Sequence, residues 1–115
     1  ATMRASAGDL AFALELVARE FRDGAGPVVE ASPSAVGLAG GHRLERLGTT
    51  LWLTLPGEAP APLCQDVGSL EIEYLGDDGA SDMSGAPAQI QRLHLTAQAG
   101  GVRLATVVFL RGATP

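Results

Sequence analysis

The stretch that most constrains the fold is 6–23, SAGDLAFALELVAREFRD. Its large apolar residues recur at intervals of four, three and four, at Leu10, Leu14, Val17 and Phe21. This spacing places them on one stripe of an α-helix. The sequence therefore predicts an amphipathic helix over 6–23 that must pack against another element.

Both ends of this predicted helix carry boundary signals. Ser6 and Asp9 have the spacing of a capping box, and Asp9 suits the positive end of the helix dipole. At the other end, Gly24 favours a left-handed residue that terminates a helix. Phe12 and Leu16 fall largely outside the main apolar stripe. The helix is thus apolar over more of its surface than one packing contact requires, which suggests a second partner.

The rest of the chain alternates between apolar and polar residues with the period of two that is typical of β-strands. We predict strands at 27–31, 35–38, 42–47, 49–55, 67–75, 89–98 and 102–110, and proline-bearing loops at 56–62 and 80–88. One helix followed by an antiparallel meander predicts an α+β fold, in which the N-terminal amphipathic helix packs on an antiparallel β-sheet. We expect a single domain over 1–115, with 1–5 as a linker or expression remnant and 28–112 mainly β.

Length and charge restrict the function further. The 115 residues suffice for one packed core without metals or disulfides. The net charge of −5 disfavours general binding to nucleic acid or anionic membranes, although a local arginine patch could still attract phosphate. No run approaches the roughly 20 apolar residues that a bilayer-spanning helix needs.

Residues that could perform catalysis are few and scattered. His42 and His94 lie in separate segments, and a catalytic or zinc-binding role would need further ligands to be brought together, so we expect structural or surface roles for both. Cys64 is the only cysteine and has no nearby base to activate it. Because no nucleophile, base and orienting group occur together, we expect no enzymatic activity, no catalytic residue and no cofactor.

Two charged groups are weaker candidates for ligand sites. Carboxylates that could supply oxygen ligands to a calcium ion occur at Asp77, Asp78 and Asp82, but their spacing does not match an EF-hand, so a plain turn is favoured over a metal site. Basic residues that could form a DNA-binding patch occur at Arg43, Arg46 and Arg92. The acidic balance of the chain makes solvated strand faces the simpler interpretation.

Four segments carry a resemblance to a known family. They are LELVAREFR at 14–22, DVGSLEIEYLGDDG at 66–79, PAQIQRLHLTA at 87–97 and TVVFLRG at 106–112. In this order, after a leading helix, they resemble the soluble head of a type IV pilin-like protein. The likeness is nearest to minor pilins and to type II secretion pseudopilins of the J or PilW-like kind, and it implies a pilin-like version of the α+β fold.

The resemblance implies a function by assembly. Such proteins are non-enzymatic structural subunits of a type IV pilus, competence or type II secretion filament, and they contact other pilins or pseudopilins through the N-terminal helix. Phe12 and Leu16 would then be the subunit contacts. The peptidase site and hydrophobic helix that mark the family do not occur in these 115 residues, so we expect that this segment was removed. In the family it anchors the subunit in the inner membrane.

The implied location is an inner membrane protein with a periplasmic head, or a cell-surface pilus. Cys64 alone cannot supply the C-terminal disulfide that many pilins have. The alternative function is a DNA- or ligand-binding module at a filament tip, or a secreted α+β binding domain, with Arg43, Arg46 and Arg92 as the DNA contacts.

Overall fold

The structure is a computed structural model that describes residues 7–24, 27–76, 85, 89–99 and 101–110. It begins with helix α1, Ala7–Arg22, where the sequence predicted a helix over 6–23. Eight strands follow in the described residues: β1 Val28–Ala31, β2 Ala35–Leu38, β3 Arg43–Leu47, β4 Thr50–Thr54, β5 Ala61–Cys64, β6 Val67–Leu75, β7 Arg92–Ala99 and β8 Val102–Phe109.

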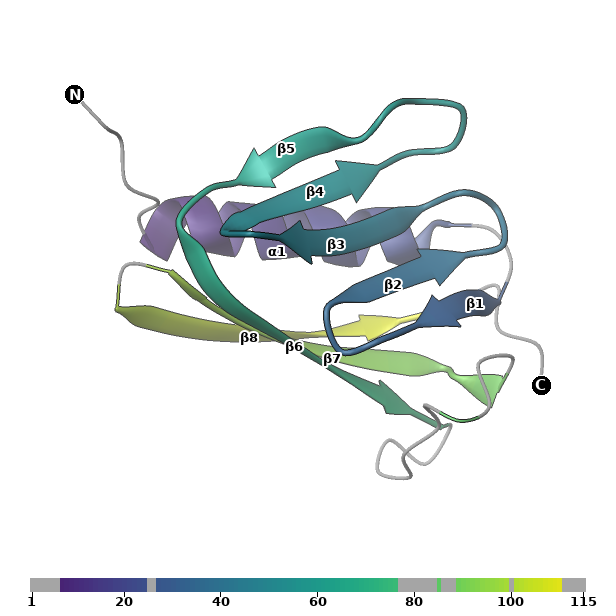
Figure 1. Cartoon of the computed structure of the whole chain (residues 1–115). Coiled ribbons are helices and arrows are strands. Elements are labelled where there is room, and N and C mark those ends of the chain that lie inside the picture. Colours follow the sequence, from purple (N-terminus) through teal and green to yellow (C-terminus); the bar gives the residue numbers. More distant parts are fainter. Residues whose placement is uncertain (1–6, 25–26, 77–84, 86–88, 100, 111–115) are drawn as a thin grey trace.

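These strands form two antiparallel sheets rather than one. The first sheet has the order β1-β2-β3-β4-β5, and the second has the order β6-β7-β8. The sheets face each other across a shared core (Figure 1). The predicted α+β, pilin-like fold is therefore wrong: the described chain is mostly β and looks more like a β-sandwich, to which a single short helix is added.

The chain leaves the first sheet for the second at Asp66. Its φ of 59° is in the left-handed region, which aspartate tolerates better than most residues, and it makes the chain turn sharply. The next amide, that of Val67, donates to the carbonyl of Thr49 at 2.8 Å. Alternation along single strands cannot reveal this turn, so the sequence predicted one meander where the structure has two sheets.

Strand β5 was not predicted from the sequence because of its prolines. It lies partly in 56–62, where the prolines predicted a loop. Proline cannot donate a hydrogen bond to a neighbouring strand, but an edge strand needs donors on one side only. Because β5 is the edge of its sheet, Pro62 can pair with Trp52 of β4, next to an irregularity in the register.

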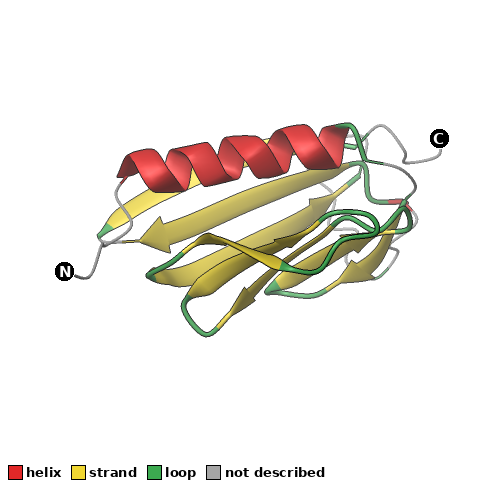
Figure 2. Cartoon of the chain, turned by 90° about the horizontal axis from the view of Figure 1, so that it is seen from above, coloured by secondary structure: helices red, strands yellow, loops and turns green. Residues whose placement is uncertain are grey.

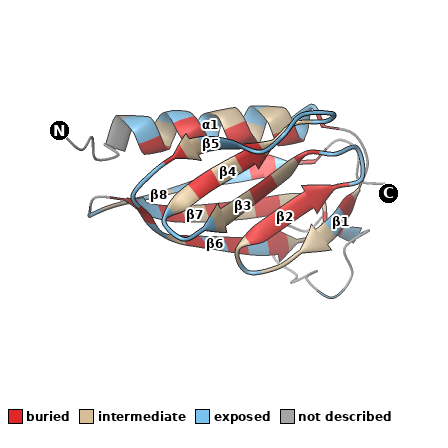
Figure 3. Ribbon diagram, turned by 45° about the horizontal axis from the view of Figure 1, so that its top comes forward, coloured by how far each residue is buried: buried red, intermediate tan, exposed pale blue. Residues whose placement is uncertain are grey.

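Helix α1 covers one side of the sandwich. It lies along β8, the edge strand of the smaller sheet, and also contacts β5 and β7 (Figures 1 and 2). Its inward stripe is buried, at Leu10, Ala13, Leu14, Val17 and Phe21. Because this stripe joins the same core as the inward residues of both sheets (Figure 3), the helix supplies part of the domain's only core cluster in the described residues.

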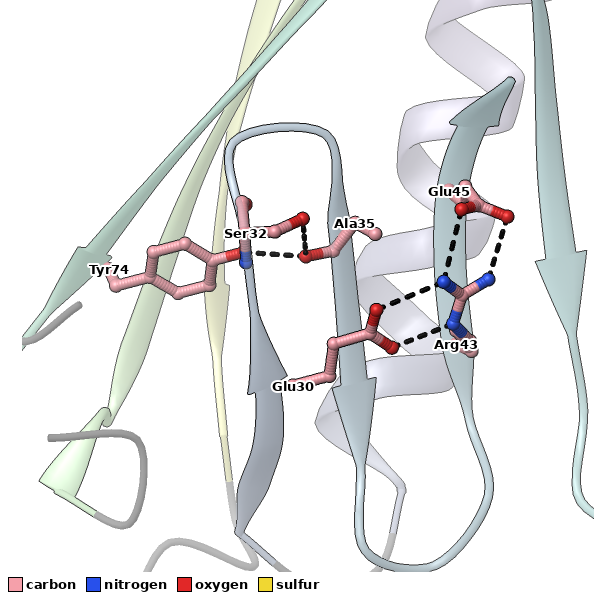
Figure 4. Close-up of polar contacts among 6 residues, drawn as sticks. All are labelled: Glu30, Ser32, Ala35, Arg43, Glu45 and Tyr74. Carbon is pink, nitrogen blue, oxygen red and sulfur yellow. Dashed lines mark hydrogen bonds and ion pairs between the residues drawn. The ribbon is translucent and has the colours of Figure 1, made fainter. Parts of the chain in front are cut away.

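On another side, Tyr74 of β6 connects the two sheets. Its hydroxyl accepts a hydrogen bond from the amide of Ser32 at 2.9 Å, and it lies 2.6 Å from the carbonyl of Ser32 and 2.8 Å from that of Ala35 (Figure 4). Ser32 and Ala35 border the turn between β1 and β2. The tyrosine is 3% exposed, so these largely buried bonds join the small sheet to the turn of the large sheet.

Candidate functional site

The outward side of α1 is the surface that the sequence singled out for subunit contacts. Phe12 is 67% exposed, while Leu16 is half-buried and packs against the core. Glu15 and Arg19, on the same side of the helix, are exposed. Of the two predicted contact residues, the structure thus places Phe12 on the surface and assigns Leu16 mainly to packing.

The outward face of the large sheet carries a cluster of three charged residues that we call the Arg43 clamp: Glu30 of β1, Arg43 of β3 and Glu45 of β3. The Nε and Nη2 groups of Arg43 donate to the two carboxylate oxygens of Glu30 at 2.7 and 3.0 Å. Nη1 and Nη2 donate to those of Glu45 at 2.8 and 3.1 Å (Figure 4). One guanidinium therefore holds two carboxylates in paired geometry, which is the stronger form of this contact.

The clamp crosses β2 at a glycine. Glu30 pairs with Gly37 of β2, and Gly37 pairs with Arg43, so the three residues stand in one row across three strands. A Cβ atom at Gly37 would lie 3.3 Å from Oε1 of Glu30 and 3.4 Å from its Cβ. Because Gly37 has no side chain, the side chains of Glu30 and Arg43 can meet above β2.

These contacts change the protonation behaviour of all three groups. Hydrogen bonds from Arg43 lower the pKa of the Glu30 and Glu45 carboxyls below the usual value of 4.5. The same hydrogen bonds, first from Glu30 and then from Glu45, raise the pKa of Arg43 above its ordinary value. The clamp is therefore fully ionised near neutral pH and carries a net charge of −1.

The three predicted DNA contacts do not form one patch. Arg43 is held by the clamp, and Arg46, near the other end of β3, donates from Nη1 to the carbonyl of Gly48. Arg92 belongs to the other sheet, where its guanidinium lies 5.2 Å from the centre of the Phe109 ring. Since Arg43 is neutralised and Arg92 is on a different sheet, this arrangement offers no shared phosphate site.

The two histidines occupy different settings. His42 is 8% exposed; its Nε2 atom lies 3.5 Å from Oε1 of Glu20, and its ring contacts that of Phe21 edge-on. His94, on the outward face of the small sheet, lies 3.3 Å from Oε1 of Glu73. Each histidine has a carboxylate neighbour, and neither lies in a group of three metal-ligating side chains within the described residues.

The remaining predicted candidates are three aspartates and the single cysteine. Asp77, Asp78 and Asp82 lie outside the described residues. The thiol of Cys64 is buried, and burial, followed by the charges of Asp9 and Asp66, raises its pKa. A raised pKa keeps the thiol protonated and weakly nucleophilic at neutral pH.

Sequence reasoning missed the Arg43 clamp. It placed Trp52 on the face opposite the leucines, either covered by another layer or exposed to a partner, and favoured the covered position. Leu51 and Leu53 are buried, so the alternating residues of β4 point outward, at Thr50, Trp52 and Thr54, and all three are partly exposed. Trp52 pairs directly with Glu45. Alternation around Leu44 does place Arg43 and Glu45 on one face, but the partnership with Glu30 depends on the strand order and could not be read from the sequence.

No protein-family model matches the chain, and no curated protein matches it significantly. In the part of the chain that the structure describes, no helix has the length and apolar character needed to cross a membrane.

Proposed function

We propose that this chain is a non-enzymatic structural subunit of a filament, a minor pilin or pseudopilin, and that it binds neighbouring subunits through the outward side of α1. The observation that carries the proposal is the 67% exposure of Phe12. A large aromatic side chain left in water loses the stabilisation that burial would give it, and aromatic residues are enriched at protein interfaces. The proposal also draws on the segments that resemble pilin-like proteins.

The division of α1 into two sides supports this function. The inward stripe is fully used by the domain's own core, so a partner can contact the helix only from outside. Around Phe12, the exposed Glu15 and Arg19 give the surface one apolar anchor and a charged rim, as in many specific interfaces. In this proposal the partners are other pilins or pseudopilins, and the domain works on the periplasmic side of the inner membrane or in a surface pilus.

Site-specific photo-crosslinking tests the proposal. A photoreactive phenylalanine analogue is placed at Phe12, or at Val29 as a control, in the protein expressed in its own cells. Val29 is 61% exposed but lies on β1, away from α1. We expect position 12 to form adducts with proteins that carry a pilin-type peptidase site and hydrophobic helix, and position 29 to form none with them. No adduct at position 12, or adducts only with proteins lacking these marks, would reject the proposal.

A substitution provides a second readout. Phe12→Asp should abolish filament assembly while leaving the free energy of unfolding within about 0.5 kcal/mol of the wild type, because an exposed side chain contributes little to the core. Normal assembly by this variant would contradict the role of α1 even if crosslinks were found.

A further inference from the structure

The outward face of the large sheet has a composition that the proposed assembly through α1 does not explain. We call the surface formed by Trp52, its two flanking threonines and the Arg43 clamp the Trp52 face. Thr50, Trp52 and Thr54 follow each other at alternate positions on β4, and Arg43 pairs with Thr54 as Glu45 pairs with Trp52. An aromatic ring, two hydroxyls and two carboxylates therefore share one side of the sheet.

On this surface, hydrogen-bond acceptors outnumber donors. Four N–H···O contacts to carboxylates occupy the guanidinium of Arg43, which leaves it one N–H group. The side chains of Glu30 and Glu45 are nevertheless 41% and 30% exposed, and each carboxylate oxygen has a second lone pair. With a net charge of −1 in the clamp, the surface accepts hydrogen bonds and repels anions.

These properties define the ligand by its chemistry. A matching partner presents many donors, carries no negative charge and has a flat apolar side that can lie on the indole of Trp52. A pyranose ring meets all three conditions, because its hydroxyls donate to carboxylates and its C–H groups form an apolar side. The site is also wide: from β1 to β4 there are three strand intervals, or about 14 Å at the usual strand spacing, which suits a chain of sugars better than a single one.

We propose that the Trp52 face binds a neutral oligosaccharide, with one sugar ring stacked on Trp52 and the hydroxyls of neighbouring sugars bonded to Glu45 and Glu30. The clamp holds both carboxylates rigidly before the ligand arrives, so little side-chain freedom is lost on binding. The site lies on the large sheet and uses no residue of α1, so it is independent of the proposed subunit contact.

Fluorescence gives a direct test, because Trp52 is the only tryptophan of the chain. The folded wild-type protein is titrated with cellohexaose and with maltohexaose as neutral probes, with hexalysine as a cationic probe and with dextran sulfate as an anionic probe. We expect a saturable blue shift of the emission with at least one neutral sugar, because stacking removes water from the indole. Neither charged probe should give one.

Variants locate the binding. Glu45→Gln retains the tryptophan and should weaken sugar binding roughly tenfold, since hydrogen bonds to a charged acceptor are the stronger ones. Phe109→Ala, on the outward face of the other sheet, is the matched control and should bind as the wild type does. The proposal is overturned if neither sugar shifts the emission up to its solubility limit, if only hexalysine does, or if Glu45→Gln and Phe109→Ala weaken binding equally.

Discussion

Replacement of Tyr74 by phenylalanine should remove the polar connection between the sheets while preserving the packing of the ring. The hydroxyl accepts one hydrogen bond from the amide of Ser32 and donates one to a carbonyl of the β1–β2 turn. Each such bond contributes about 1 kcal/mol, so Tyr74→Phe should lower the free energy of unfolding by about 2 kcal/mol. The amide of Ser32 keeps the carbonyl of Ala35 as an acceptor at 2.9 Å, which prevents a larger loss.

The same hydroxyl makes stability depend on alkaline pH. Burial, partly offset by the hydrogen bond from Ser32 and reinforced by the charge of Glu30, raises the pKa of Tyr74 from 10.0 to about 12. A group whose pKa is higher in the folded state stabilises the fold below its unfolded pKa, and this stabilisation is lost as pH rises through the folded pKa. Between about pH 10 and pH 12 the wild type should therefore lose about 2 to 3 kcal/mol.

Two measurements check this reasoning. Urea unfolding at neutral pH gives the difference between wild type and Tyr74→Phe, which should appear in the midpoint and not in the slope. Because Tyr74 is the only tyrosine, tyrosinate absorbance reports its ionisation alone. The buried Cys64 also contributes to alkaline sensitivity, so the comparison is made with the variant at each pH. Equal losses in wild type and variant between pH 10 and 12, or ionisation of Tyr74 at its ordinary pKa, would refute the argument.

Four further predictions concern other positions. Gly37→Ala should destabilise the protein by about 1 kcal/mol relative to Gly68→Ala in urea unfolding, because Glu30 is held by Arg43 and cannot easily yield to a new methyl group. At the control position, the nearest atom to a Cβ at Gly68 is 3.9 Å away. Equal effects of the two substitutions would contradict this role of Gly37. The free energy of unfolding should fall as pH drops below about 4.5, through the lowered pKa values of Glu30 and Glu45. Since these side chains are partly exposed, the clamp accounts for at most about 1 kcal/mol of this loss. Arg43→Met should abolish the clamp's contribution to the loss. Asp66→Val should cost about 1 to 2 kcal/mol because of its positive φ, while Asp66→Gly should stay within about 0.5 kcal/mol; similar thermal melting of both variants would exclude backbone strain as the cause. Phe21→Ala should lower the free energy of unfolding by about 3 to 5 kcal/mol, because it leaves a cavity in the core. Phe12→Ala should lower it by less than about 0.5 kcal/mol. Comparable losses for the two variants in urea unfolding would mean that α1 packs differently.

The sequence predicted local structure better than global arrangement. The spacing of Leu10, Leu14, Val17 and Phe21 identified the buried stripe of α1, and alternation around Leu51 and Leu53 identified the inward face of β4. Both patterns report only which side of an element avoids water. They contain no information on which strands are neighbours, so a single sheet and two sheets are compatible with the same alternation.

The candidate site residues could be placed to different degrees for the same reason. The exposure of Phe12 follows from its angular position on one helix, which the sequence provides. The pairing of Glu30 with Arg43 depends on β1 and β3 flanking β2, and on a glycine between them. The three arginines suggested as DNA contacts looked like one group only while the strands were assumed to form one sheet. Long-range pairing separates Arg92 from the others, and composition alone could not show this.

The helix is part of the fold and still leaves a surface for partners. Its inward stripe belongs to the core that both sheets share, and it lies beside β8. This stripe cannot be withdrawn without opening the core. Any partner that binds α1 must therefore add to the folded domain and cannot replace one of its elements. This limits the contact to the outward side of the helix. Among the described residues of α1, Phe12 is the only large apolar side chain that is predominantly exposed.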